Sequence, residues 1–139
     1  MFEKYFKDDE IKNEYKKKFI SLWPGWLGKE NDHLLDEVTE ADWSKFNSLI
    51  KIIFKHYRLQ VVDFKKRRLI NVKNIEDLLC DYEDSGNKNS NEFSIYIIPE
   101  LDCVLSEDWD YTFILWYKGE NAIKSLRPFI EKSGLFDFN

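Results

Sequence analysis

The segment Phe93–Lys118 constrains the fold of this chain more than any other stretch of the sequence. It reads FSIYIIPELDCVLSEDWDYTFILWYK and is rich in β-branched and aromatic residues, which favour strands. Short interruptions at Pro99–Glu100 and Glu107–Asp110 divide it into three apolar stretches. Connections this short join antiparallel neighbours, because a parallel crossover needs about a dozen residues or more. The segment therefore predicts a three-stranded antiparallel β-meander, alone or within a larger sheet.

Two segments before the meander have the periodicity of amphipathic helices. In Asp8–Trp23 the apolar residues recur at spacings of four, four and three, which aligns them in one stripe and leaves Lys16–Lys18 largely in solvent. Thr39–Asp42 resembles a capping box, and an apolar seam continues from it to Tyr57. Between these helices, the tryptophans of Trp23–Trp26 flank a Pro-Gly turn. We expect them to cover the core where the chain reverses, the alternative being a stacking platform for a ligand.

Residues 58–73 allow two interpretations. We expect the preceding helix to continue to about Lys66, although the apolar residues on either side of the basic run also fit two strands. The run Lys65–Arg68 is the densest basic cluster of the chain. It has no interleaved aromatic residues for base stacking, and the chain as a whole is acidic, so we expect no nucleic-acid partner.

The last portion of the helical region and the end of the chain predict two more helices. Asn74 is expected to cap a short helix that ends near Glu83. After the meander, apolar residues at helical spacing predict a closing helix, in which Pro128 should cause a kink or start a second short helix. Ser133–Gly134 fits the end of this helix.

These elements define the expected fold class. With 139 residues, 43% of them hydrophobic and 17% aromatic, the chain can form one domain with a packed core and no disulfide or metal staple. We expect an α+β fold in which N-terminal helices pack on a C-terminal antiparallel meander with a closing helix. Within the single domain 1–139, the helical region spans 1–84, a polar loop covers 85–91, and the sheet with its closing helix spans 92–139.

The cysteines and the N-terminus indicate a cytoplasmic protein. Cys80 and Cys103 lack CxxC spacing, and the N-terminal MFEKYFKDDEIK lacks the apolar region of a secretory signal. No apolar run approaches the roughly 18 residues that would span a bilayer. We therefore expect reduced, buried thiols and no membrane partner.

The charge of the chain is distributed unevenly. Residues 1–73 carry 16 Lys and Arg against 12 Asp and Glu, whereas residues 74–139 carry 5 against 14. An acidic surface repels phosphate backbones and can attract a basic protein over long range. The alternative is that the negative charge only maintains solubility.

The acidic residues in the turns of the meander are the candidates for chemistry. Paired carboxylates there could act as general acid and base or hold Mg²⁺. However, the strand after them lacks an ExK pattern, and Asp108–Asp110 lacks the continuation of a calcium loop. No nucleophile motif or phosphate loop occurs either. The sequence thus predicts no catalytic residues, metal or cofactor, and a metal-dependent hydrolase using the acids at 100–110 remains the alternative.

An interaction module is the function that fits these observations best. Trp109 lies among acids at the tip of a predicted hairpin, where an exposed indole with a charged rim would suit a protein interface. An inward-facing Trp109 would instead leave the acids as protection against edge aggregation. The candidate partner contacts are Glu100, Asp102, Glu107, Asp108, Trp109 and Asp110.

The C-terminal third also resembles a known group of proteins. The segment IIPELDCVLSEDWDYTFILWYK followed by LRPFIEKSGLFDF is similar to the strand, strand, helix ending of small acidic immunity proteins from bacterial polymorphic toxin systems. The resemblance implies a protein that neutralises a basic toxin, often a nuclease, by masking its surface. Asp108 and Trp109 would then be candidate contacts with the toxin.

Overall fold

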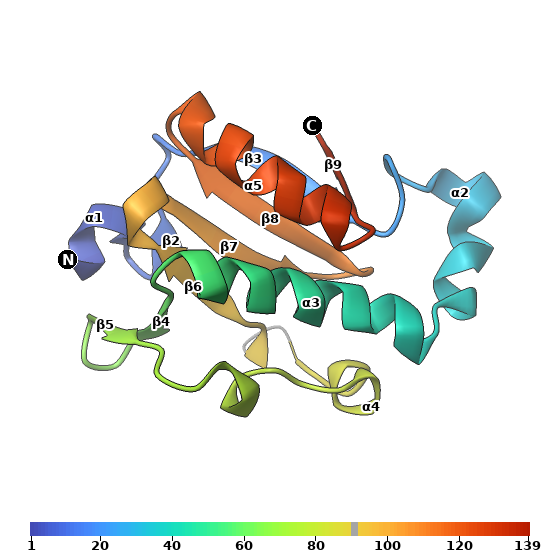
Figure 1. Ribbon diagram of the computed structural model, residues 1–139, viewed down its shortest axis with the longest axis horizontal. Helices are drawn as coiled ribbons and strands as arrows, with labels where there is room; N and C mark the ends of the chain where they lie inside the picture. The colour runs from blue at the N-terminus through green and yellow to red at the C-terminus, as the bar shows by residue number, and fades with distance from the viewer. Residues whose placement is uncertain (90–91) are drawn as a thin grey trace.

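The computed structural model describes residues 1–89 and 92–139. Its main element is a seven-stranded sheet with the order β5-β4-β6-β7-β8-β3-β9, in which each neighbouring pair is antiparallel (Figure 1). The strands are β3 (Lys16–Ser21), β4 (Gln60–Asp63), β5 (Arg68–Asn71), β6 (Ile95–Ile98), β7 (Cys103–Asp108), β8 (Thr112–Tyr117) and β9 (Phe136–Phe138). The α+β class and the predicted meander, which is β6-β7-β8, are confirmed.

Two long helices, α3 (Glu40–His56) and α5 (Glu120–Lys132), cover one face of this sheet (Figure 1). The capping box of α3 is present as predicted. The Thr39 hydroxyl accepts a hydrogen bond from the amide of Asp42 at 3.2 Å, and the Asp42 carboxylate accepts one from the amide of Thr39 at 3.0 Å. The apolar seam of α3 is buried against the sheet, and its buried residues are Trp43, Phe46, Leu49, Ile50 and Ile53.

A short N-terminal arm covers a portion of the other face. It consists of α1 (Phe2–Tyr5) and a two-stranded hairpin, β1 (Phe6–Lys7) with β2 (Glu10–Ile11). Its aromatic side chains pack with Tyr15 onto Ile97 and Val104, forming a second core cluster. The middle of the sheet is thus buried on both faces, while the region near β8 and β3 is left more open.

The predicted helix at Asp8–Trp23 is wrong. This segment forms the β1–β2 turn, β2 and strand β3, which pairs with β8 on one side and β9 on the other. The lysines expected in solvent make contacts: the Lys17 ammonium lies 4.7 Å from the centre of the Trp116 ring, and that of Lys18 lies 3.6 Å from the Asp137 carboxylate. Pairing on both edges stabilises the strand more than the local apolar stripe stabilises a helix.

The helix does not continue past residue 57, so the alternative of two strands describes residues 58–73 correctly. Tyr57 already has extended backbone angles, with φ of −138° and ψ of 154°. β4 and β5 form an antiparallel hairpin, and Arg67 adopts a left-handed φ of 52° in its turn. The basic run Lys65–Arg68 therefore lies at the tip of this hairpin.

The remaining helices are short. They are α2 (Gly28–Asn31), η1 (Asp32–Glu37), η2 (Ile75–Asp77), α4 (Tyr82–Ser85) and η4 (Pro99–Leu101). Asn74 caps as predicted, since its side chain accepts a hydrogen bond from the amide of Glu76 at 3.1 Å. The single helix expected from Asn74 to Glu83 is wrong, because two short helices replace it. Of the predicted loop at 85–91, residues 90 and 91 lie outside the described residues.

The C-terminal segment returns to the sheet. α5 runs through Pro128 as one helix, so the predicted second helix is absent, and Gly134 ends it with a φ of 82°. β9 then pairs with β3 and is held by Asp137, whose carboxylate accepts hydrogen bonds of 3.1 and 2.8 Å from Arg127. The expected division into a helical region over residues 1–84 and a separate sheet region is therefore wrong, since β3, β4 and β5 belong to the sheet.

Candidate functional site

The candidate site is built on the turn between β7 and β8, which run between the α1 side and the α2 side of the molecule (Figure 1). Asp108 pairs with Thr112, so three residues form the turn. Two of them, Asp110 and Tyr111, have left-handed φ angles of 58° and 55°. Aspartate tolerates this conformation, whereas tyrosine rarely adopts it. The turn is supported from β3, where the Ser21 hydroxyl donates a hydrogen bond of 3.0 Å to the carbonyl of Tyr111.

Trp109 projects from this turn and has 57% of its surface exposed. Its ring packs T-shaped against Phe93, with the ring centroids 4.7 Å apart. Asp108 is half-buried and Asp110 is exposed, and among the described residues neither carboxylate has an ion-pair partner. Tryptophan is enriched among the residues that dominate binding energy at protein interfaces.

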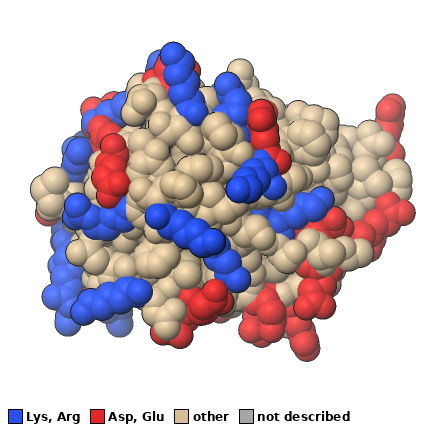
Figure 2. All heavy atoms as spheres, in the orientation of Figure 1, with Lys and Arg blue, Asp and Glu red and all other residues tan. Residues whose placement is uncertain are grey.

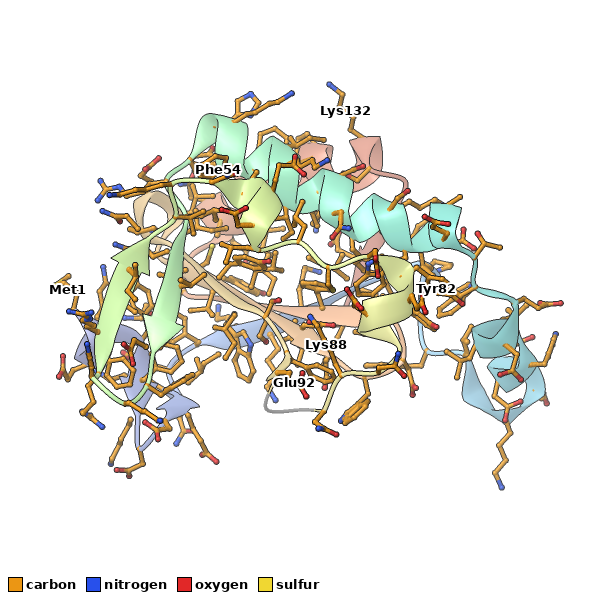
Figure 3. The ribbon with its side chains drawn as sticks, turned by 90° about the horizontal axis from the view of Figure 1, so that it is seen from below. Met1, Phe54, Tyr82, Lys88, Glu92 and Lys132 are labelled. Carbon is orange, nitrogen blue, oxygen red and sulfur yellow. The ribbon has the colours of Figure 1, made fainter. Side chains whose placement is uncertain are left out.

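Glu107, although predicted with these residues, is used inside the molecule. Its side chain is only 6% exposed and accepts hydrogen bonds from the Lys88 ammonium at 2.9 Å and from the Ser94 amide at 3.0 Å. Lys88, labelled in Figure 3, follows α4. Burial by itself lowers the pKa of Lys88, but the hydrogen bond and charge of Glu107 outweigh burial and raise the pKa above its usual value. This ion pair links the segment that precedes β6 with strand β7.

Glu100 and Asp102 lie at the opposite end of β7, beside η4. Glu100 accepts a hydrogen bond from the amide of Arg58 at 2.9 Å, and Asp102 lies 3.1 Å from the ammonium of Lys4. β7 has six residues, which corresponds to about 20 Å at about 3.3 Å per residue. The predicted contacts therefore do not form one site, and Glu100 and Asp102 are remote from Trp109.

This separation also bears on the hydrolase alternative, which would use the acids at 100–110. A metal-dependent hydrolase needs carboxylates that converge on one point. Within residues 1–89 and 92–139, no group of three or more His, Cys, Asp or Glu side chains is arranged to hold a metal ion. The acids at 100–110 are instead divided between the two ends of β7.

The structure adds acids that the sequence interpretation did not assign to the site. Asp36 lines a pocket together with Asp110, and Asp32 lines a second pocket that also contains Asp108 and Asp110. Figure 2 shows acidic side chains gathered on the side of α2 and α4, and basic ones on the side of α1 and β5. The density of acids in the segment 30–42 is the sequence feature that could have indicated them. These acids are Glu30, Asp32, Asp36, Glu37, Glu40 and Asp42.

Two pockets, each of about 280 Å³, flank Trp109. The first lies toward α4 and is lined by Trp43, Lys88 and Glu107 among others. The second lies toward the segment between β3 and α2 and contains Trp26, which is 63% exposed. The expectation that Trp26 covers the core is therefore wrong, although Phe19 and Phe138 pack against its ring.

A larger groove of about 790 Å³ lies on the sheet face that the helices leave uncovered. Its lining includes Ile95, Ile114 and Trp116 from the sheet, and charges of both signs such as Asp9 and Lys17. An apolar floor with a mixed rim does not favour one class of ligand over another.

The basic end of the molecule is formed by the tip of the β4–β5 hairpin and the N-terminal arm. Its residues Lys65–Arg68 are exposed, and the Arg67 guanidinium lies 4.8 Å from the centre of the Phe2 ring and 4.0 Å from the Asp9 carboxylate. The expectation that no nucleic acid binds here remains a prediction.

Cys103 offers no nucleophile for the site. Cys103 is fully buried in β7, and burial raises the pKa of its thiol to about 12. Cys80 is half-buried, and neither cysteine forms a disulfide. A buried thiol with so high a pKa carries almost no reactive thiolate at neutral pH.

Comparison of the chain with known protein families, curated proteins and solved structures finds no match. None of the helices in the described residues combines the length and the apolar character needed to cross a membrane. The geometry of the β7–β8 turn and its surroundings is thus the basis for a functional proposal.

Proposed function

We propose that this chain is a non-catalytic binding protein that holds a basic protein partner at the end of the molecule formed by the β7–β8 turn, α2 and η1. Neutralisation of a basic toxin, as in the immunity proteins that the C-terminal third resembles, is the form of this function that we expect. We name the end the acidic tip and define it by Asp32, Asp36, Asp108, Trp109 and Asp110.

The exposure of Trp109 is the observation that carries the proposal. Its 57% exposed surface is large for a tryptophan, a residue type that is highly buried on average. Tryptophan is also enriched among the residues that dominate binding energy at interfaces. A protein that used the acids only for solubility would gain nothing from an exposed indole among them.

The charges of the acidic tip support a basic partner. Asp108 and Asp110 flank the indole, and Asp32 and Asp36 approach it from a different segment of the chain. Unpaired charges of one sign accelerate association with an oppositely charged partner and suppress association with a similarly charged one. The acidic tip therefore selects against nucleic acid and in favour of basic proteins.

Affinity capture with the immobilised chain, using a lysate of the source organism, tests the proposal. The wild-type chain should retain a basic protein that is eluted by salt, and calorimetry should then measure its affinity. Trp109→Ala should weaken binding of that purified protein by about 30-fold, as expected for a hot-spot tryptophan. Asp108→Asn/Asp110→Asn should slow association and reduce the dependence of binding on salt.

The chain offers matched controls at its other end. Asp8 and Asp9 lie in the β1–β2 turn with left-handed φ angles of 53° and 64°, and Asp8→Asn/Asp9→Asn removes the same charge. Ile70→Ala removes an apolar side chain that is 41% exposed. Both controls should bind as the wild type does. Failure to retain any basic protein, or equal retention by the Trp109→Ala and wild-type chains, would overturn the proposal.

A further inference from the structure

The pocket between Trp109 and Trp26 has a distinctive chemical lining. Its aromatic lining consists of Trp23, Trp26, Trp109 and Phe138, and its carboxylates are those of Asp32, Asp108 and Asp110. No lysine, arginine or histidine is among its described lining residues. The lining thus combines aromatic faces with negative charge and leaves that charge uncompensated.

The two exposed indoles are held in place by other rings. Trp26 packs T-shaped against Phe19 at 4.7 Å and against Phe138 at 5.1 Å, while Trp109 packs T-shaped against Phe93 at 4.7 Å, all measured between ring centroids. These contacts restrict the indoles before any ligand arrives. A pre-ordered aromatic wall loses little conformational freedom on binding.

The charge of the pocket selects a cation. The faces of indole rings carry negative electrostatic potential and attract cations, and the three aspartates act in the same direction. None of the three has an ion pair within the described residues. The aspartates do not converge as metal ligands, since no such group occurs among residues 1–89 and 92–139, so the cation should be organic.

The size of the pocket limits the occupant to a small group. Its volume of about 280 Å³ is below the range of about 300–1,000 Å³ that is typical of drug-sized ligands. A single long side chain fits this space better than a larger molecule. Among cationic side chains, arginine has a planar guanidinium that stacks on aromatic faces and donates hydrogen bonds in a fork to carboxylates, whereas the lysine ammonium is compact and strongly hydrated.

We propose that this pocket receives an arginine side chain, with the guanidinium lying against the indoles of Trp26 and Trp109 and facing the carboxylates of Asp32, Asp108 and Asp110. The inference rests on the proposed function, because it names the group of a basic partner that the acidic tip would hold. Trp26 was not among the predicted partner contacts, but the alternative of a ligand-stacking platform at Trp23–Trp26 includes it, and here it supplies a second wall of the same site.

The direct test titrates the purified chain with the peptide acetyl-Gly-Arg-Gly-amide and with its citrulline counterpart, which has the same shape and no charge. Two-dimensional NMR of the indole N–H groups reports binding at individual tryptophans. The arginine peptide should shift the Trp26 and Trp109 signals, with a dissociation constant in the millimolar range. The citrulline and lysine peptides should bind at least about tenfold more weakly. Equal shifts with the citrulline peptide, or shifts confined to Trp43 and Trp116, which do not line this pocket, would overturn the proposal. Equal binding of the lysine peptide would overturn the assignment to arginine.

Two variants of the pocket and one control distant from it distinguish loss of the binding site from a general defect in folding. Trp26→Ala should weaken the arginine peptide by about tenfold, and Asp32→Asn/Asp110→Asn, which keeps the shape of the pocket, should do the same. Asp8→Asn/Asp9→Asn, at the other end of the molecule, should leave binding unchanged. Equal loss in this control would overturn the proposal, because it would show a general effect of net charge.

The outcomes separate the inference from the proposed function. If a basic partner depends on Trp109 but the arginine peptide causes no shift, the arginine pocket is refuted and the binding function stands. If the peptide binds as described but no basic protein is retained by the chain, the pocket stands and the proposed function is refuted.

Discussion

Replacement of Lys88 tests how the support of the acidic tip is held together. The ammonium of Lys88 and the carboxylate of Glu107 are 2.9 Å apart, and their side chains are only 14% and 6% exposed. In Lys88→Met the Glu107 carboxylate stays buried, and among the described residues the Ser94 amide is its one remaining hydrogen-bond donor. Loss of one partner of a buried pair costs about 3–5 kcal/mol, and the partial exposure of Lys88 places the expected loss near 3 kcal/mol. For a chain of 139 residues this lowers the melting temperature by roughly 10 °C.

Replacement of Glu107 should reduce stability less than replacement of Lys88. In Glu107→Gln the long side chain of Lys88 can turn its ammonium toward water, and the glutamine oxygen can still accept from Ser94, so we expect a loss of only about 1–2 kcal/mol. The double variant Lys88→Met/Glu107→Gln leaves no buried charge and should also lose only about 1–2 kcal/mol. Urea unfolding at pH 7, followed by tryptophan fluorescence and far-UV circular dichroism, measures all three.

The matched control is Lys51→Met. Lys51 forms an ion pair of 3.3 Å with Glu76, but these side chains are 47% and 66% exposed, so the loss should be below about 0.5 kcal/mol. Equal effects of Lys88→Met and Lys51→Met, or additive losses in the Lys88–Glu107 double variant, would show that Lys88 and Glu107 do not stabilise the fold as a coupled buried pair. Since folding raises the pKa of Lys88, its contribution is fully present below the unfolded value of about 10.4 and is lost as pH rises through the folded value.

Three further predictions concern other regions of the fold. The Arg127 guanidinium holds the pKa of Asp137 below its usual range, so the contribution of Asp137 is present above roughly pH 4 and is lost as pH falls through the lowered value; Arg127→Met should therefore reduce stability in urea more at pH 7 than at pH 3. Thr39→Ala removes the N-cap of α3 and should lower the free energy of unfolding by about 1 kcal/mol, and an unchanged urea midpoint would contradict the capping role. In the folded protein, a colourimetric thiol reagent should modify Cys80 before Cys103, because burial raises the pKa of Cys103 to about 12; simultaneous modification would show that the sheet opens readily.

The meander and α3 could be predicted because local and tertiary preferences agree in those segments. Thr39 and Asp42 form the capping box that the sequence indicates, and the seam behind them faces the sheet. In β6 both alternating faces are apolar, and both are covered in the fold. Where local propensity, apolar pattern and tertiary packing favour the same conformation, the sequence pattern predicts the structure correctly.

The helix at Asp8–Trp23 was wrong because its apolar spacing is compatible with two structures. Phe19 and Ile20 lie on opposite faces of β3, and Tyr15 packs in the N-terminal cluster instead of on a common stripe. The decisive factor is pairing with β8 and β9, whose residues are distant in sequence. The spacing of apolar residues within one segment carries no information about such pairing.

The candidate site was only partly predicted. The turn at Trp109 was predicted, but whether its indole faces outward was left open, and Glu107 and Asp102 are held by lysines from other parts of the chain. That Trp26 lies near the β7–β8 turn could not be predicted without knowing which strands are neighbours in the sheet. That adjacency depends on β3 lying between β8 and β9.

The position of β3 also determines when the sheet can be completed during synthesis. Lys16 pairs with Tyr117 and Phe19 with Phe138, so β3 leaves the ribosome long before its partners exist. At about 5–20 residues per second, the delay is roughly 5–20 s. During this interval β3 has two unpaired edges, which are templates for aggregation between nascent chains. The three consecutive lysines Lys16–Lys18 carry like charges, which oppose pairing between copies of this strand.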